Sequence, residues 1–434
     1  MQKSSIANDQ RSAAETADLI RNGKITSVEV VLSLLRRIAK WNPRINAFAV
    51  LQADAALKRA EALDRMAAKG KWAGILHGVP FTIKECVDIK GMPTSLGTRK
   101  LRNNKAGKNA PVVDRILKAG GVLLGKTTLS EAFADWQCES ENFGRTRNPW
   151  NLRKTTGGSS GGACAAVASG MSLFDVGSDL GGSIRNPAHF CGVYGFKPSE
   201  GRIPVAGQRD RVDSAKPAPI LNALGPIARS AADLELLFPV LASCPVKRIH
   251  LDARQLKIAY MPEFPEIGAE PDVRDAVKKT AMRLRRKGCG VELTRPDMDY
   301  EALWKLRETL RDIVTGVSKE SLRKYAGERK TYIDLWEKFF KSYDFFLCPV
   351  TARTAWNHCR PYKDPWNKNG RGYPRMFYYT TLFNLTGHPA LSVPSGMDRH
   401  GLPIGVQMVS GLNRDEKLLA FARLMENRPP KVAS

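Results

Sequence analysis

Three short segments carry residues that could together activate a hydroxyl group. The first ends at Lys84, which follows the apolar run Val79-Pro-Phe-Thr-Ile83 and is therefore expected to be drawn inside the fold. Burial disfavours the charged form of lysine, and a lysine whose pKa is lowered in this way can act as a general base. A lysine at a strand end can also simply reach solvent, so Lys84 taken alone does not indicate a site.

The other two segments are rich in glycine and serine. Residues 156–170 contain Ser159 and Ser160 directly before an alanine-rich stretch, so hydroxyls and free N–H groups meet at the start of a helix. Alone, this arrangement suits either an anion site or a helix cap. Residues 177–187 contain Leu180-Gly-Gly-Ser183, in which two residues without side chains leave backbone N–H groups open around one hydroxyl. Such an array can stabilise an oxyanion.

Taken together, the three segments resemble the amidase signature family. The runs Gly157-Gly-Ser-Ser-Gly-Gly162 and Gly177-Ser-Asp-Leu-Gly-Gly-Ser-Ile-Arg185 reproduce its Gly/Ser-rich pattern, with the two key serines 24 residues apart. Gly195-Phe-Lys-Pro198 and residues 224–230 and 384–394 extend the resemblance over nearly the whole chain, and Lys84-Glu-Cys86 is similar to the fatty-acid-amide-hydrolase branch. The resemblance implies an α/β fold of the amidase-signature type, with a large mixed β-sheet covered on both faces by helices.

The resemblance also implies a role for each site residue. Ser183 is expected to be the nucleophile, Ser159 to relay its proton and Lys84 to be the base, with a cis peptide bond before Ser159. The oxyanion is expected to be held by the backbone N–H groups of Leu180, Gly181, Gly182 and Ser183. The supporting positions are Gly158, Ser160, Asp179 and Arg185, of which the last two are expected to form a hydrogen-bonded pair, and Phe133 is expected to contact the acyl group of the substrate.

The implied reaction is hydrolysis of a carboxylic amide to an acid and ammonia or an amine, through an acyl-enzyme on Ser183. No metal or cofactor is expected. The main alternative is the A-type component of an aminoacyl-tRNA amidotransferase, which would use the same triad to release ammonia from glutamine. We can assign no residues to glutamine recognition, and this favours the stand-alone hydrolase. Residues 205–216 and 299–345 match no substrate pattern, so the substrate class stays open.

Three further motifs match known patterns without their structural context. Residues 120–127 match a phosphate-binding loop, but Val122-Leu-Leu124 in its middle is typical of a strand and a helix precedes it. Residues 157–161 match a nucleophile elbow, but polar residues 148–156 stand where an apolar strand is needed. His388, the one late histidine among small loop residues, would be its base. Ser321-x-x-Lys324 lies in a charged stretch without partner motifs. We interpret all three as chance matches.

Alternating helix and strand patterns must position these residues. Helices are predicted over residues 26–42, 53–70, 111–120, 230–242, 272–287, 299–341 and 414–426, the first opened by a Thr26-x-x-Glu29 capping box and ended by Pro43. Strands are predicted over residues 79–85, 122–124, 173–177, 257–261, 291–294, 345–350, 390–394 and 405–410. Strands separated by helices indicate a mostly parallel or mixed sheet. We expect one domain over residues 1–434, with the signature core at about 75–230 and a peripheral helical layer at about 265–345.

Composition limits the class of protein. The chain has 434 residues, 43% hydrophobic and 26% charged, which is typical of a folded domain. Its formal net charge of +25 suits an anionic partner such as nucleic acid, but many basic enzymes carry such a charge. The expected partner is therefore a small amide substrate. A nucleic-acid-binding protein whose triad is inactive is the remaining alternative. A homodimer is left open.

The cysteine spacing and the lengths of the apolar runs indicate where in the cell the protein is expected. The eight cysteines form no C-x-x-C pair, so neither a zinc site nor a disulfide framework is indicated. No apolar run approaches bilayer length, the N-terminal residues show neither a signal-peptide core nor the anchoring helix of the fatty-acid branch, and a cytoplasmic location is expected.

Overall fold

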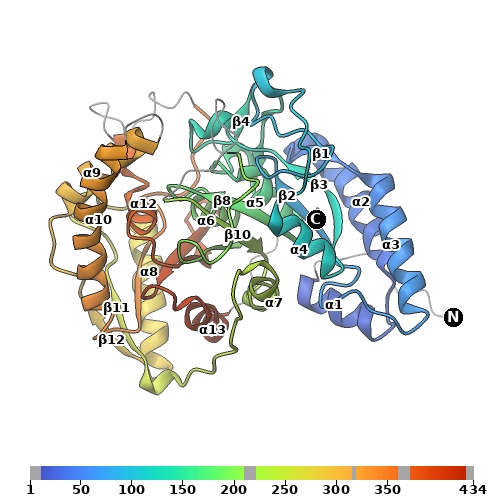
Figure 1. The fold of residues 1–434 in the computed structure, drawn as a ribbon. Helices are drawn as coiled ribbons and strands as arrows, with labels where there is room; N and C mark the ends of the chain where they lie inside the picture. The colour runs from blue at the N-terminus through green and yellow to red at the C-terminus, as the bar shows by residue number, and fades with distance from the viewer. Residues whose placement is uncertain (1–10, 210–220, 315–318, 360–371, 427–434) are drawn as a thin grey trace.

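An 11-stranded sheet forms the centre of the computed structural model, which describes residues 11–209, 221–314, 319–359 and 372–426 (Figure 1). In spatial order its strands are β1 Phe48–Leu51, β3 Val122–Thr127, β2 Pro80–Lys84, β8 Phe174–Asp179, β10 Ala223–Ala228, β9 Tyr194–Lys197, β14 Ala390–Met397, β15 Pro403–Val409, β13 Phe345–Pro349, β11 Lys257–Tyr260 and β12 Gly290–Leu293. Two small hairpins lie outside it, formed by β4 Glu139–Ser140 with β5 Gly144–Arg145 and by β6 Arg147–Asn148 with β7 Asn151–Thr155.

The helices alternate with these strands along the chain. They are α1 Ala13–Arg21, α2 Ser27–Ile45, α3 Ala53–Ala67, α4 Pro111–Lys118, α5 Gly161–Ala168, α6 Arg185–Cys191, α7 Ala231–Leu241, α8 Pro271–Arg286, α9 Tyr300–Val314, α10 Lys319–Phe339, α11 Gly372–Arg375, α12 Tyr378–Leu385 and α13 Asp415–Met425, with short 3₁₀ turns at Arg99–Leu101, Glu131–Phe133 and Ala253–Gln255. In Figure 1, α2 and α3 lie at one end of the molecule and α9 and α10 at the other.

Both faces of the sheet are covered, as the alternation of β13 shows. Successive side chains of a strand point to opposite faces. Phe345 and Leu347 belong to a core cluster that also contains side chains of α7, α8 and α13, whereas Phe346 and Cys348 belong to a second cluster built with α9, α10 and α12. The predicted α/β fold with helices on both faces is therefore confirmed.

The pairing at the centre of the sheet brings two predicted site segments together. Strand β2 is parallel to both β3 and β8, while β10 is antiparallel to β8 and β9, so the sheet is mixed. Because β2 and β8 are parallel neighbours, their C-terminal residues Lys84 and Asp179 lie at the same edge of the sheet. The loop after β8 and the end of β2 can therefore form one site.

Several predicted boundaries were wrong. Helix α2 starts at the predicted capping box but continues through Pro43 to Ile45, where Asn46 ends it in a left-handed conformation with φ 59°. The single helix expected over residues 299–341 is instead two helices, α9 and α10, on either side of residues 315–318, which lie outside the described residues. Strands β1, β9 and β10 were not predicted.

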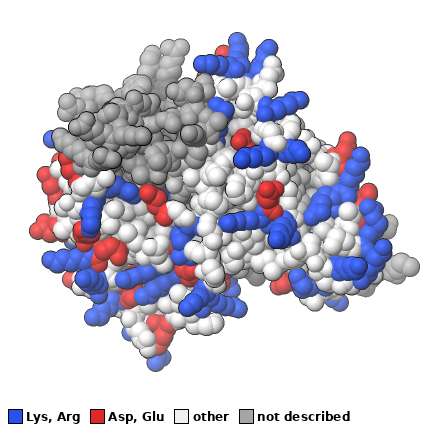
Figure 2. Space-filling model, in the orientation of Figure 1, with Lys and Arg blue, Asp and Glu red and all other residues white. Residues whose placement is uncertain are grey.

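The surface and the helices bear on the expected partners. On the face in Figure 2, basic side chains predominate at the top and right, while basic and acidic side chains are mixed at the left. Within the described ranges, no helix has both the length and the apolar character that a membrane span requires.

Candidate active site

Lys84 lies at the end of β2 and is completely buried. Its Nζ lies 2.6 Å from Ser159 Oγ and 2.9 Å from Ser178 Oγ. Burial lowers the pKa of Lys84, while the nearby Cys86 and Asp179 act in the opposite direction. Burial also raises the pKa of Cys86 to about 11, so this thiol stays neutral near pH 7. The site therefore favours the uncharged amine that a general base requires.

The Ser159 loop connects β7 to α5. The Gly158–Ser159 peptide bond is cis, as the resemblance implies. Ser160 is the residue before α5, and its Oγ donates a hydrogen bond to Ser178 O over 3.2 Å. On Gly162 a Cβ would lie 2.2 Å from Thr128 Oγ1, so this position admits only glycine and lets α5 pack closely on the segment after β3. The loop thereby holds Ser159 against the end of β2.

Ser183 lies in the turn between β8 and α6 and is partly exposed, whereas Ser159 is buried. Ser183 Oγ has no hydrogen-bond partner among the described residues, so no bond joins the two serine hydroxyls in this structure. The backbone instead connects the two loops, because Ser160 N–H donates to Ser183 O over 3.1 Å. The amine of Lys84 and the hydroxyl of Ser159 are therefore buried, whereas Ser183 is accessible to a substrate.

One of the four expected oxyanion donors is already engaged. Gly182 N–H donates to Asp179 Oδ1 over 2.7 Å, so this donor is occupied within the turn. The N–H groups of Leu180, Gly181 and Ser183 have no partner within the described part of the chain. Gly182 has φ +105°, a conformation that favours glycine. The Asp179 carboxylate fixes the turn, and three N–H groups stay available for an oxyanion.

A buried network of hydrogen bonds around Arg185 holds this turn in place. The Arg185 guanidinium binds the Asp179 carboxylate with two bonds, of 2.8 and 3.0 Å, as the resemblance implies. Two residues that we did not predict complete the network: Arg185 also donates to Asn384 Oδ1 over 2.6 Å and to Gln407 Oε1 over 2.7 Å. Burial alone would raise the pKa of Asp179, but the Arg185 charge holds it well below the ordinary value. Asp179 is therefore ionised throughout the usual pH range.

Three neighbours of the reacting groups bear on the site. The Phe133 ring centroid lies 5.0 Å from Lys84 Nζ, so Phe133 borders the amine of Lys84. Ser178, which the sequence analysis missed, binds the same amine; its position beside Asp179 in the signature run was the available clue. Trp136 Nε1 donates to Gly181 O over 3.4 Å, and the Trp136 ring stacks on Phe377 with centroids 4.4 Å apart. The stacked rings of Trp136 and Phe377 therefore border the turn of residues 180–183, which we call the oxyanion turn.

The phosphate-loop match, His388 and the Ser321-x-x-Lys324 match lie outside this site, whereas residues 157–161 of the elbow match are part of the Ser159 loop itself. Residues 122–127 of the phosphate-loop match form the buried strand β3, and Lys126 Nζ donates to Pro93 O over 2.5 Å. His388 is buried and its Nε2 lies 3.0 Å from Glu337 Oε1. Ser321 and Lys324 lie in α10. Residues 210–216 of the stretch that matched no substrate pattern lie outside the described residues.

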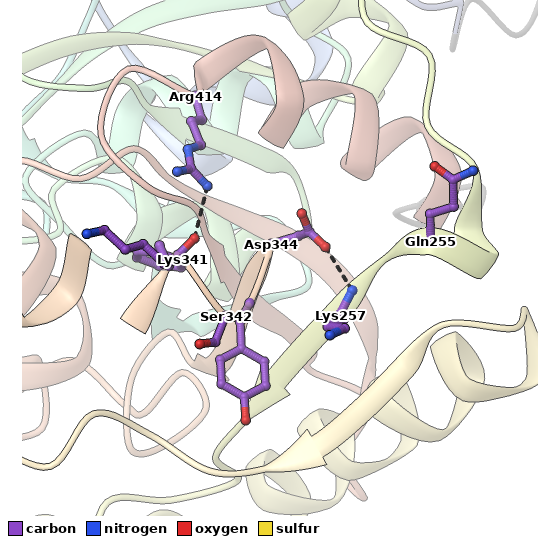
Figure 3. Close-up of a pocket in the computed structure, with 8 residues that line it drawn as sticks. Gln255, Lys257, Lys341, Ser342, Asp344 and Arg414 are labelled. Carbon is purple, nitrogen blue, oxygen red and sulfur yellow. Dashed lines mark hydrogen bonds between the residues drawn. The ribbon is translucent and has the colours of Figure 1, made fainter. Parts of the chain in front are cut away.

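A pocket of about 620 Å³ lies at the starts of β11 and β13 (Figure 3). Its lining includes Lys257, Asp344 and Arg414, and none of the residues expected to be catalytic. Lys257 N–H donates to Asp344 Oδ2 over 2.8 Å, and Arg414 Nη1 donates to Phe340 O over 3.1 Å. Its polar groups thus bind one another, and we assign no chemistry to it.

Comparison with known proteins identifies the family. A family model described as Amidase matches residues 29–306 and 298–419. The chain belongs to the amidase family. This amidase is therefore an enzyme that hydrolyses an amide C–N bond, and the resemblance seen in its sequence is confirmed.

Individual relatives differ in what their names say they do. The amidase is 32% identical to an indoleacetamide hydrolase from Bradyrhizobium diazoefficiens, over 98% of this chain and 87% of that protein. It is 30% identical to the A-type component of a glutamyl-tRNA(Gln) amidotransferase from Bdellovibrio bacteriovorus, over 96% of each. Its fold is similar to that of a fatty acid amide hydrolase, with TM-score 0.85 and 23% identity over 98% of this chain and 86% of that one.

Proposed function

We propose that Ser183 is the nucleophile, Ser159 the proton relay and Lys84 the general base of this amidase. The observation that carries the proposal is the contact of 2.6 Å between Lys84 Nζ and Ser159 Oγ inside a buried site beneath the partly exposed Ser183. A neutral lysine can take a proton from a serine hydroxyl, and a positioned partner of this kind activates an otherwise weak nucleophile. No histidine is needed.

The steps follow from this arrangement. As Ser183 Oγ attacks the amide carbon, its proton passes to Ser159 Oγ, whose own proton passes to Lys84 Nζ. The carbonyl oxygen becomes an oxyanion that accepts from the N–H groups of Leu180, Gly181 and Ser183, each donor of this type typically being worth about 3–4 kcal/mol. Protonation of the leaving amine through Ser159 breaks the C–N bond, and water then hydrolyses the Ser183 ester. The bond between the two serine hydroxyls would form on substrate binding, since catalytic hydrogen bonds often tighten only then.

For the substrate we propose a neutral amide with an aromatic or other apolar acyl group. Trp136 and Phe377 form a stacked wall beside the oxyanion turn. Leu180 is partly exposed and packs with the same aromatic cluster. The similarity to a protein named indoleacetamide hydrolase supports an aromatic acyl group.

Single substitutions test these roles. We expect Ser183→Ala to abolish hydrolysis of indoleacetamide and of a simple aryl amide. Ser159→Ala and Lys84→Met should each reduce kcat by several orders of magnitude, and the double variant little further, because the groups act as one unit. Ser395→Ala, which removes a partly exposed hydroxyl that bonds only Val393 O, is the matched control. A serine-directed fluorophosphonate should label Ser183; labelling of Ser159 instead, or near-full activity of Lys84→Met, would refute the assignment.

The second candidate is the A-type component of an amidotransferase, which releases ammonia from glutamine. The similarity to such a protein over 96% of the chain favours it. It predicts that the chain forms ammonia from glutamine faster than from indoleacetamide, and that a partner complex with tRNA stimulates this release. We can assign no residues to glutamine recognition, and this favours the stand-alone hydrolase.

A further inference from the structure

Phe133 covers the amine of Lys84 in an unusual backbone conformation. Its ring centroid lies 5.0 Å from Lys84 Nζ. Both Ala132 and Phe133 have positive φ values, of 43° and 60°, which non-glycine residues rarely adopt. Such conformations persist only where surrounding contacts enforce them, and they are concentrated at functional sites. The question is therefore what holds Phe133 in this place.

A chain of hydrogen bonds connects Ala132, the neighbour of Phe133, to Glu85, the residue after Lys84. Ala132 N–H donates to Leu96 O over 2.9 Å. The carboxylate of Glu85 in turn accepts from Leu96 N–H over 3.0 Å and from Ser95 N–H over 2.5 Å. Glu85 is completely buried and directly follows Lys84 at the end of β2. The end of β2 thus carries both the Lys84 amine and Glu85, which holds the segment that positions Phe133.

Lys126 secures the other side of that segment. Its buried Nζ donates to Pro93 O over 2.5 Å and to Thr94 Oγ1 over 3.1 Å. Burial raises the pKa of Glu85, and the positive charge of Lys126 acts in the opposite direction. Residues 93–96 are therefore held by a buried acid and a buried base together. The proposed catalytic steps use neither group, and burial of an acid and a base is costly unless both are paired.

We propose that Phe133 is a positioning residue that keeps water away from the amine of Lys84, and that Glu85 holds Phe133 there through Leu96 and Ala132. The inference rests on the proposed function in one respect, namely that Lys84 acts as the base. It adds to that function two residues, Phe133 and Glu85, that keep the amine of Lys84 uncharged.

The groups around Lys84 explain why water must be excluded. Asp175 and Asp179 face it from β8, and their negative charges favour the ammonium form. Cys86 and Cys138 are also near, with pKa values raised by burial, so both stay neutral thiols near pH 7. Ser159 and Ser178 bind the amine without charge. Only exclusion of water favours the neutral amine, so its loss should raise the pKa of Lys84.

The pH dependence of kcat/KM for a small aryl amide tests the proposal. A raised pKa moves the acid limb to higher pH, and each pH unit of movement costs tenfold in rate below the limb. For Phe133→Ala we expect at least about tenfold loss at pH 7, with most of it regained at high pH. Phe133→Leu should keep the acid limb at its wild-type pH, since it keeps the apolar cover. Phe143→Ala, which removes a partly buried ring of the same region, is the control.

The contrary results are distinct. An acid limb that is unchanged or lower in Phe133→Ala would overturn the inference, because a lower limb would mean that attraction between ring and cation dominates. A Leu variant whose acid limb moves as far as that of the Ala variant would overturn it too. Glu85→Gln should move the limb in the same direction as Phe133→Ala, and a wild-type limb would refute the role of Glu85. The ¹⁵Nζ shift of Lys84, assigned with Lys84→Met, follows the titration without turnover, so failure of this inference is separable from failure of the proposed function.

Discussion

Ser160 and Ser178 are joined by two hydrogen bonds: Ser160 Oγ donates to Ser178 O over 3.2 Å and accepts from Ser178 N–H over 3.4 Å. Each serine is also next to the reacting groups, since Ser160 follows Ser159 in the chain and Ser178 Oγ accepts from Lys84 Nζ. The pair therefore sets the spacing between Lys84, the proposed base, and Ser159, the proposed proton relay.

We expect Ser160→Ala to lower kcat roughly tenfold to a hundredfold with little change in KM, because small displacements of reacting groups are costly. The matched control is Ser169→Ala at the other end of α5, where Oγ donates to Ala165 O over 2.6 Å. Both variants should lose about 1 kcal/mol of unfolding free energy, but only the first should lose turnover. Full kcat in Ser160→Ala would show that the pair has no positioning role.

Breaking the buried Arg185–Asp179 pair should be far more damaging than breaking an exposed one. In Arg185→Met the Asp179 carboxylate keeps its burial but loses its counter-charge, and we expect a loss of about 3–5 kcal/mol in urea unfolding. Arg399 and Asp272 form the same type of pair at the surface, and Arg399→Met should leave stability almost unchanged. Equal effects in the two variants would contradict this prediction.

The same pair predicts the acid side of the stability curve. The pKa of Asp179 is lower in the folded protein than in the unfolded chain, so its contribution is present above about pH 4 and is lost as the pH falls. The comparison of wild type with Arg185→Met by urea unfolding between pH 7 and pH 3 should show the difference between them shrinking on acidification.

Lys197 predicts that stability also rises with pH on the alkaline side. Burial lowers its pKa to about 7, against about 10.4 in an unfolded chain. Between these values the unfolded state binds more protons, so the contribution of Lys197 to stability should rise as the pH rises from 7 towards 10. Wild type should therefore gain stability relative to Lys197→Met between pH 6.5 and pH 9.5. A constant difference between the two proteins in urea unfolding would mean that Lys197 titrates normally.

Gly182→Ala should inactivate the enzyme for steric reasons. A Cβ there would lie 2.2 Å from Thr380 Oγ1 and 2.5 Å from Asn186 Nδ2, so the turn that carries Ser183 would have to move. Gly268 has a similarly positive φ of +75° but open space around it. Gly268→Ala should cost about 1 kcal/mol of stability and leave kcat intact. Fluorophosphonate labelling of Ser183 measures the damage directly, and normal labelling of Gly182→Ala would refute the prediction.

Local patterns indicated which residues lie together at this site better than they indicated what supports them. Lys84, Ser159 and Ser183 stand in short motifs, and the family resemblance of these motifs implied the roles that we propose. The partners of Arg185 could not be found in this way, because Asn384 on α12 and Gln407 on β15 come from segments far along the chain. Their contact with Arg185 depends on tertiary packing, which residue spacing does not report.

The missed strand β10 shows the same limit. Its sequence contains Gly225 and Pro226, and proline is rare in central strands. The structure pairs β10 with β8 along its whole length but with β9 only at Ile227 and Ala228. At Gly225 the Phe196 carbonyl comes so close that a Cβ would lie 2.0 Å from its oxygen. Residues that looked like a loop are therefore required by close packing of strands.

The contacts of Arg185 with Asn384 and Gln407 also bear on how the enzyme is made. A ribosome releases the N-terminal part of a chain first, so Lys84, Ser159 and Ser183 emerge long before the segment that secures the turn. We expect a nascent chain halted before residue 384 to be catalytically silent although it contains every reacting group. Hydrolysis would then begin only once synthesis is almost finished.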